Sequence, residues 1–221
     1  SQVFNLVVFV LVAVVTIVGV VVVTEAQRNI PVSYARMVRG STTYGGSHTF
    51  LPLRLLQAGV IPIIFAISVI LFPPMVAQFL VRSQAEWLVS AAQKTIELFQ
   101  NQIFYGISYF VLVFGFTYFY TAVVFKPDQI AENLQKQGGF VPGIRPGSST
   151  VEYLGKTMNR IVLPGAVFLS LIAVLPLGLE QLTGSQAFVI GGTSVLIVVS
   201  VVIETVRQVN AQLVMRDYDE L

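Results

Sequence analysis

The sequence contains no cysteine, a single histidine and few charged residues, and each shortage removes a class of chemistry. Without cysteine the chain can form neither a disulfide nor a thiolate metal site, although its redox compartment stays open. His48 alone cannot supply the ligand cluster of a catalytic zinc site. It also lies in a polar segment, whereas the Ser–His pair of a membrane protease would need to lie at membrane depth. An ordinary loop residue is the better interpretation of His48.

Other catalytic patterns are absent from the sequence as well. An aspartyl membrane protease needs two aspartates inside membrane-spanning segments, but Asp128, Asp217 and Asp219 all lie in polar segments. The sequence has no glycine-rich loop of the kind that cradles phosphates. We therefore expect no enzymatic activity, no metal and no cofactor.

The shortage of charge indicates a membrane protein. Charged residues make up 11% of the chain and hydrophobic residues 55%, whereas a typical soluble domain is about 25% charged. A helix needs about 20 apolar residues to cross the hydrocarbon core of a bilayer. Because the chain opens at Ser1, without a start methionine, and enters an apolar run at once, we expect it to be part of a longer polypeptide. Uncharged apolar runs predict an all-α polytopic membrane protein with five spans, at about residues 3–23, 55–81, 103–125, 161–179 and 186–203.

Prolines inside two of these runs predict breaks in the helices. Pro62, Pro73 and Pro74 lie in the second run, so we expect kinks and a helix end near Phe72. The fourth run holds two more prolines. Each break frees backbone polar groups that need partners within protein, which favours a packed bundle over helices that lie singly in lipid.

Lysine and arginine set the expected orientation, because cytoplasmic loops of membrane proteins carry an excess of both. All but two of the 13 basic residues lie in residues 24–54, residues 126–160 and the tail 204–221. We therefore expect both long loops and the C-terminus in the cytoplasm, and the start of the chain outside. Residues 83–102 have apolar side chains at helical spacing, which predicts an amphipathic helix either on the outer membrane interface or over the tops of the spans.

The five apolar runs contain no ionisable residue. Ionisable groups inside spans mark proton relays and ion sites in transporters. Their absence weakens, without removing, the hypothesis that the chain is half of a secondary transporter. A non-conducting membrane assembly subunit stays open as a second alternative. A pore lined by aliphatic side chains can still gate, because a hydrophobic constriction stays dry and blocks ions.

The segment Gly138–Gly147 (GGFVPGIRPG) holds one arginine between prolines and glycines. Pro142 and Pro146 fix φ near about −65°, while the glycines allow tight turns. A rigid turn that projects Arg145 loses little entropy on docking, and a guanidinium can make bidentate contacts with carboxylate or phosphate. Beside ordinary loop charge, Arg145 is therefore a candidate preorganised contact point for a cytosolic partner.

Three stretches of the sequence are similar to a known family: Phe50–Pro74 (FLPLRLLQAGVIPIIFAISVILFPP), Gly138–Gly147 with Met158–Gly165, and Gly191–Val199 (GGTSVLIVV). They resemble bacterial SecY, the central subunit of the Sec protein-conducting channel, and occur in order along nearly the whole chain. The resemblance implies the C-terminal half of SecY, the sixth to tenth of ten spans, in the bacterial cytoplasmic membrane. It implies a pseudosymmetric clamshell with a central pore for unfolded secretory polypeptides and a lateral gate that releases membrane segments into lipid.

The resemblance also assigns roles to residues in two spans. Ile64 lies where the family places one residue of the aliphatic pore ring, and Ile197 matches another; the other ring residues and the plug would belong to the first half. Only the motifs AGVIP and GGTS single out these two, because an isoleucine in a span is nearly always there for packing or faces lipid. The span with Ile64 resembles the gate helix of the second half, so the lateral gate would include Ile61, Phe65, Ser68 and Phe72.

Basic residues of the two loops match the family's contact points. Arg145 matches the arginine of the second long cytoplasmic loop, which is implicated in coupling to the SecA motor ATPase. Both loops also receive the ribosome, where basic side chains can meet RNA phosphates, and Arg36 and Arg39 are the candidates in the first loop. Relatives carry further basic residues after Gly40, where this sequence has Ser-Thr-Thr. Fewer basic side chains would therefore contact the ribosome. The implied partners are SecE, SecG, SecA, the ribosome, translocating polypeptides, the lipid bilayer and the N-terminal half of the same protein.

Overall fold

The computed structural model describes residues 2–34, 37–39, 42–44, 48–57, 59, 61–83, 85–183, 197–199, 201–206, 208–210 and 212–213. Its helices are α1 (Gln2–Glu25), α2 (Ile61–Leu80), α3 (Glu86–Gln100), α4 (Gln102–Val124), α5 (Pro127–Lys136) and α6 (Ser148–Thr183). Its strands are β1 (Gln27–Tyr34), β2 (Met37–Arg39), β3 (Thr42–Tyr44), β4 (His48–Arg54) and β5 (Gly139–Phe140). Residues 197–199 and 201–206 near the C-terminus are helical as well.

The helices confirm the expected polytopic membrane fold. Within the described residues, the stretches Ile61–Leu80, Gln102–Lys136 and Ser148–Gly178 are long and apolar enough to cross a membrane. A shorter apolar helix, Val14–Glu25, forms the second half of α1. Helices suit the bilayer interior because they satisfy their own backbone polar groups. Most of the expected fifth span, residues 186–203, lies outside the described residues.

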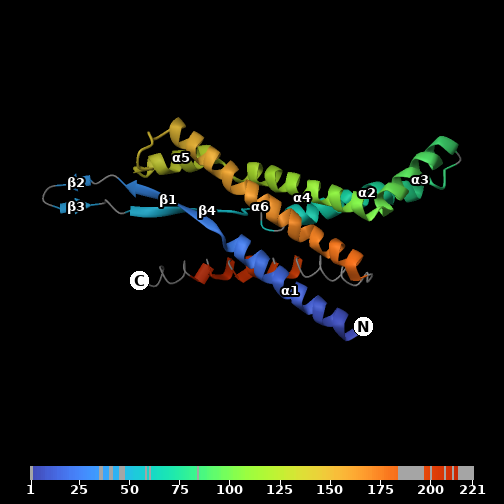
Figure 1. The fold of residues 1–221 in the computed structure, drawn as a ribbon. Coiled ribbons are helices and arrows are strands. Elements are labelled where there is room, and N and C mark those ends of the chain that lie inside the picture. The colour runs from blue at the N-terminus through green and yellow to red at the C-terminus, as the bar shows by residue number, and fades with distance from the viewer. Residues whose placement is uncertain are drawn as a thin grey trace.

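Helix α6 is the centre of the bundle. It packs against α4, α5 and α1, and Figure 1 shows it running from the sheet end of the molecule toward the end where α1 begins. Buried apolar side chains of α2, α4 and α6 meet in one core, in which Ile63, Ala66, Ile70, Tyr109, Val113, Leu169, Ala173 and Leu177 take part. Many side chains of α2 that point away from this core are exposed, among them Ile64, Phe72 and Phe79.

Helix α2 starts later than the expected second span and lacks the expected interruption. It begins at Ile61 rather than near Leu55, because the Leu55 amide bonds to the Ala26 carbonyl (2.8 Å) and extends the β1–β4 pairing. The expected helix end near Phe72 is wrong, since α2 continues through Pro73 and Pro74 to Leu80. Proline removes one backbone donor, but its fixed φ is compatible with a helix, and the packing of α3 and α4 against α2 holds the segment in place.

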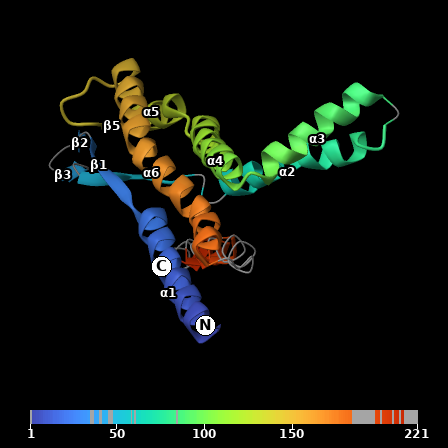
Figure 2. The ribbon, with the colours of Figure 1, turned by 45° about the vertical axis from the view of Figure 1, so that its right-hand side comes forward.

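The two long polar segments form one structured unit rather than separate loops. Strands β1 and β4 pair antiparallel from Gln27↔Arg54 to Ser33↔His48, and β5 from the second segment pairs with the other edge of β1. Ile30 and Leu53 of this sheet pack with Phe125, Val141 and Leu154 in a second apolar core. Figure 2 shows the strands beside the start of α6. The sheet and the segment around Arg145 are therefore held together.

The expected loop 126–160 is also largely helical. It contains α5, and α6 begins at Ser148 rather than near residue 161. Proline at the first position of α5 costs no hydrogen bond, because the first amides of a helix have no intrahelical partner. Helix α5 packs against α6 and buries Ala131 and Leu134. The polar composition of this segment reflects exposed helix faces, not an absence of helices.

The expected amphipathic helix is confirmed as α3, Glu86–Gln100. It packs against α2 and α4 and buries Ala92, and it lies beside α2 at the end of the molecule away from the sheet (Figure 1 and Figure 2). Trp87 and Leu98 remain exposed on it. The helix thus packs on the spans while it also presents apolar side chains outward.

Gly165 on α6 is expected to be sensitive to a single added methyl group. A Cβ there would lie 3.1 Å from both the Cγ and the carbonyl oxygen of Leu55, in the link between β4 and α2. Because backbone must shift to make room, Gly165→Ala should destabilise the fold by about 1–3 kcal/mol, measured as a lower melting temperature of the full protein in detergent. Gly155→Ala is the matched control on the same helix, since its Cβ meets nothing within 4 Å. Equal melting temperatures of the two variants would contradict this contact.

Candidate functional site

One face of α2 carries the residues that the sequence singled out. Ile64, Phe65 and Phe72 are 43%, 52% and 60% exposed, while Ile63 on the opposite face is fully buried. Residues three and four apart share one face of a helix. This face, called the α2 stripe below, consists of the half-buried Ile61 and the exposed Ile64, Phe65, Ser68, Phe72, Met75 and Phe79. A continuous apolar stripe of this kind marks a surface for lipid or for another protein segment.

The start of the α2 stripe borders a cavity near the sheet end of the bundle. The cavity has a volume of about 460 Å³, and Ile61, Ile64, Tyr120, Val201 and Glu204 contribute to its wall. Helical residues near the C-terminus thus come close to α2. Ile197 does not line the cavity, but it lies four residues before Val201 and hence on the same helix face. The structure therefore brings Ile64 next to the segment that carries Ile197.

The side chains of Phe65 and Ser68 each make a specific interaction within the chain. The rings of Phe65 and Phe116 stack, with centroids 5.9 Å apart and planes at 25°. Both rings also line an apolar cavity of about 240 Å³ with Phe119 and Val123. The Ser68 hydroxyl donates to the Ile64 carbonyl (2.9 Å), so its polar group is satisfied within the helix. Ser68 can therefore face an apolar environment at little cost.

The C-terminal half of the α2 stripe lies where the helix lacks two backbone hydrogen bonds. Pro73 and Pro74 have no amide hydrogen, so they cannot donate to the carbonyls of Val69 and Ile70 four residues earlier. Helices bend most readily where such bonds are missing. Phe72 lies directly before the two prolines. The missing bonds therefore leave α2 with fewer internal restraints directly beside the exposed Phe72 side chain.

Arg145 lies in a turn whose backbone is fixed on both sides. The Ile144 amide donates to the Val141 carbonyl (3.1 Å), and the Thr150 hydroxyl donates to the Arg145 carbonyl (3.0 Å). Gly143 and Gly147 have φ values of +83° and +100°, a region that other residues adopt only with strain. The expected preorganised turn is confirmed as local geometry. Its side chain at Arg145 is exposed.

The other basic candidates are less fully described. Arg36 lies outside the described residues, and Arg39 is in β2, although the structure does not describe its side chain. Among the described residues, Lys136 pairs with Glu132 (2.7 Å) and Lys156 pairs with Glu152 (2.6 Å) on exposed helix surfaces. Arg145 has no such ion pair within the described part of the chain. Its guanidinium is thus available to a partner.

Sequence reasoning missed the strand pairing that joins the two basic segments. Tyr34 pairs with Gly139, and a Cβ on Gly139 would lie 2.9 Å from the Tyr34 ring. A local signal for the hairpin was present, because Ile30 and Val32 alternate with exposed residues, as strands require. The pairing of β5 had no comparable local signal. Within the described residues, no group of His, Cys, Asp and Glu could hold a metal ion.

Comparison with known proteins gives one consistent result. The family model SecY matches residues 1–206. The chain is 45% identical over 201 residues to the protein translocase subunit SecY of Streptomyces galbus, covering 90% of this chain and 45% of that protein. It is also 45% identical over 215 residues to the protein translocase subunit SecY of Mycobacterium tuberculosis (strain ATCC 25618 / H37Rv), covering 94% and 48%. The chain thus spans about half the length of the curated relatives that it matches.

Proposed function

Because this chain belongs to the SecY family, we propose that it forms one half of a protein-conducting channel. The channel moves unfolded secretory polypeptides across the bacterial cytoplasmic membrane and releases apolar segments sideways into lipid. The observation that carries this proposal is the α2 stripe, an exposed apolar face on a helix whose opposite face is buried in the bundle core. Such a face needs an occupant, and in this proposal the occupants are the other half of the channel and the translocating chain.

The chemistry of the α2 stripe suits a conduit. Apart from Ser68, whose hydroxyl is satisfied within the helix, its side chains are apolar. A surface without free charges gives unlike polypeptides little to bind, and a constriction of aliphatic side chains stays dry when it is empty. Ile64 and Ile197 are proposed as pore-ring residues, and Ile61, Phe65, Ser68 and Phe72 as part of the lateral gate. The backbone hydrogen bonds missing at Pro73 and Pro74 support a gating role for the C-terminal half of the stripe.

The sheet and the Arg145 turn are proposed as the cytoplasmic contact surface. The excess of lysine and arginine in these segments supports the cytoplasmic orientation. Arg145 is the proposed contact for the SecA motor, and Arg36 and Arg39 are proposed contacts for ribosomal RNA. SecE and SecG are the proposed membrane partners, on the grounds of family membership. The lack of ionisable residues in the apolar runs gives no support to the alternative of a secondary transporter.

Photocrosslinking from position 64 tests the proposal. A photoactivatable residue replaces Ile64 in the complete channel, and a stalled secretory chain is engaged in native membranes. We expect a crosslink to the translocating chain that requires the motor, ATP and a signal sequence. The control position is Val111, which is 59% exposed on α4 and is not part of the stripe. A crosslink from position 64 only to lipid or neighbouring helices, with the substrate engaged, would overturn the pore assignment.

A further inference from the structure

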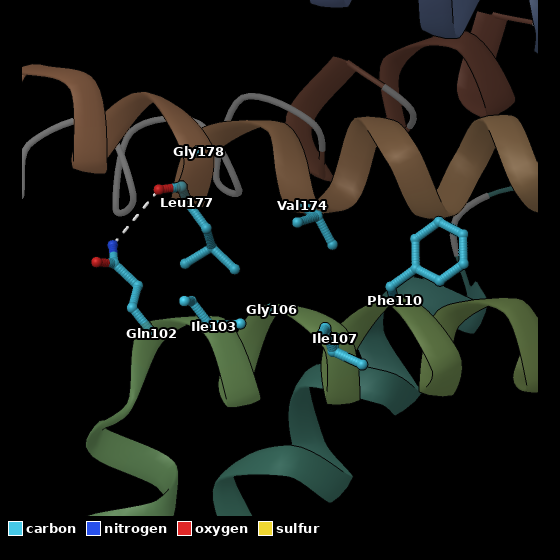
Figure 3. A pocket seen from close by; sticks show the side chains of 8 residues that line it. All are labelled: Gln102, Ile103, Gly106, Ile107, Phe110, Val174, Leu177 and Gly178. Atoms are coloured by element: carbon cyan, nitrogen blue, oxygen red, sulfur yellow. Dashed lines mark hydrogen bonds between the residues drawn. The ribbon is translucent and has the colours of Figure 1, made fainter.

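A third hollow lies between α4 and α6 at the end of the bundle away from the sheet. It has a volume of about 320 Å³, at the lower end of the range of about 300–1,000 Å³ for ligand pockets. Figure 3 shows its lining side chains on the facing sides of the two helices. We call it the α4–α6 groove, and Gln102, Ile103, Gly106, Ile107, Phe110, Val174, Leu177 and Gly178 line it.

The groove exists because two of its lining residues have no side chain. A Cβ on Gly106 would lie 3.7 Å from Val174 Cγ1, an ordinary contact, and a Cβ on Gly178 would meet nothing within 4 Å. The two helices therefore touch at Gly106 and leave open space at Gly178. Ile103 and Ile107 beside the opening are 66% and 61% exposed. The groove is thus open to the surroundings of the bundle, not sealed inside it.

In a membrane, the open side of the groove between α4 and α6 faces hydrocarbon wherever no other protein segment covers it. Both helices belong to stretches that are long and apolar enough to cross a membrane. From Ile103 to Phe110 the groove follows α4 for about 10 Å at ~1.5 Å per residue. An apolar groove of this length, open to the bilayer, matches part of an extended acyl chain.

The end of the groove nearest the C-terminus of α6 carries a polar pair. The Gln102 side-chain amide donates to Glu180 Oε2 (2.6 Å) and to the Leu177 carbonyl (3.4 Å, Figure 3). Glu180 ends the apolar run of α6, where a span meets the membrane surface. A carboxylate has about four acceptor sites, so the bond from Gln102 leaves room for another donor. A negative charge at this point attracts an ammonium group and repels a phosphate that carries no neighbouring cation.

We propose that the α4–α6 groove binds one acyl chain of an aminophospholipid such as phosphatidylethanolamine, with the headgroup ammonium at Glu180. The apolar lining selects a chain, and Gln102 orients the Glu180 carboxylate that selects the headgroup. Anionic phospholipids without an amine are disfavoured at the same place. This inference needs the chain to lie in a membrane but does not rest on polypeptide translocation.

Photoactivatable lipids test the site. The complete channel is reconstituted in nanodiscs that contain equal parts of phosphatidylethanolamine and phosphatidylglycerol, with one of the two carrying a diazirine in its acyl chain. Adducts are mapped by mass spectrometry. On residues 103–110 and 174–178 we expect about threefold more adducts from the ethanolamine lipid, the effect expected of a partly exposed ion pair. At Leu163, which is exposed on α6 outside the groove, we expect the two lipids to be equal.

Variants separate the roles of the groove and the charge. Gly178→Leu should fill the groove and remove most adducts there, whereas Gly115→Leu, at a position on α4 that is also open, should not. Glu180→Gln keeps the shape of the groove and an acceptor for the hydrogen bond from the Gln102 side chain. It should therefore abolish the headgroup preference while adducts persist. Glu97→Gln on α3 is the control for loss of an exposed charge.

Two results would overturn the proposal. Equal labelling of the groove by both lipids, unchanged in Glu180→Gln, would show that the groove takes any acyl chain and that Glu180 selects nothing. Absence of adducts in the groove while Leu163 is labelled would show that another protein segment covers it. Neither result would bear on the α2 stripe, so failure of this inference is distinct from failure of the proposed function.

Discussion

Reversing the charge at Arg145 is expected to uncouple motor-driven export while the protein still folds and inserts. The turn around Arg145 is held by its own backbone bonds, and the guanidinium is exposed with no ion pair among the described residues. Arg145→Glu therefore removes little from the fold. A charge-assisted contact is worth about 1.5–3 kcal/mol, so its loss should slow motor-dependent export by about 10- to 100-fold, measured in inverted membrane vesicles.

The control for Arg145→Glu is the same charge reversal at Arg82. Arg82 is exposed after the end of α2, at the opposite end of the bundle from the sheet. Arg82→Glu should leave motor-dependent export unchanged, and protein levels of both variants are matched by immunoblot. Arg145→Lys keeps the charge but loses the planar guanidinium. An export rate between those of the parent and Arg145→Glu would therefore indicate a bidentate contact. Export by Arg145→Glu at the parent rate would refute the assignment and favour a passive scaffold.

The membrane-spanning helices were predictable from sequence because their signal is local and long. The expected span 103–125 is α4, Gln102–Val124, and the polar residue before it forms the helix start. The Asn101 side chain accepts the amides of Ile103 (3.0 Å) and Phe104 (3.3 Å), as N-cap residues do. The error at Phe72 has a different origin. Proline rules describe an isolated helix, whereas α2 continues through Pro73 and packs against α3 and α4.

The sheet and the cavities were not predictable because they depend on contacts between distant residues. Gly139 pairs with Tyr34 across the two long segments, and its lack of a side chain has meaning only beside that ring. Gly178 likewise has no recognisable role until α4 lies opposite it. Arg145 is the contrasting case, because Pro142, Gly143 and Gly147 fix a turn by local dihedral preferences alone. Site residues that a local turn presents are therefore easier to infer than those that a cavity assembles.

Placing asparagine at position 64 is expected to open a resting ion leak. Ile64 is 43% exposed and lines the cavity shared with Val201 and Glu204. In a dry constriction, a side-chain amide supplies the hydrogen bonds that let water enter, and ions follow the water. A barrier lowered by about 1.4 kcal/mol or more raises conductance at least about tenfold. Planar-bilayer recordings of the idle Ile64→Asn channel measure this increase.

Ile197→Asn should act in the same direction, because Ile197 shares a helix face with Val201 of that cavity. The matched control is Leu163→Asn on α6, where an exposed aliphatic side chain lies outside the cavity. That variant carries the same polar group into the membrane but should leave the resting current at the parent level. A leak in all three variants would indicate general loosening of the bundle. Resting current at the parent level in both isoleucine variants, together with unchanged rejection of defective signal sequences, would remove Ile64 and Ile197 from the seal.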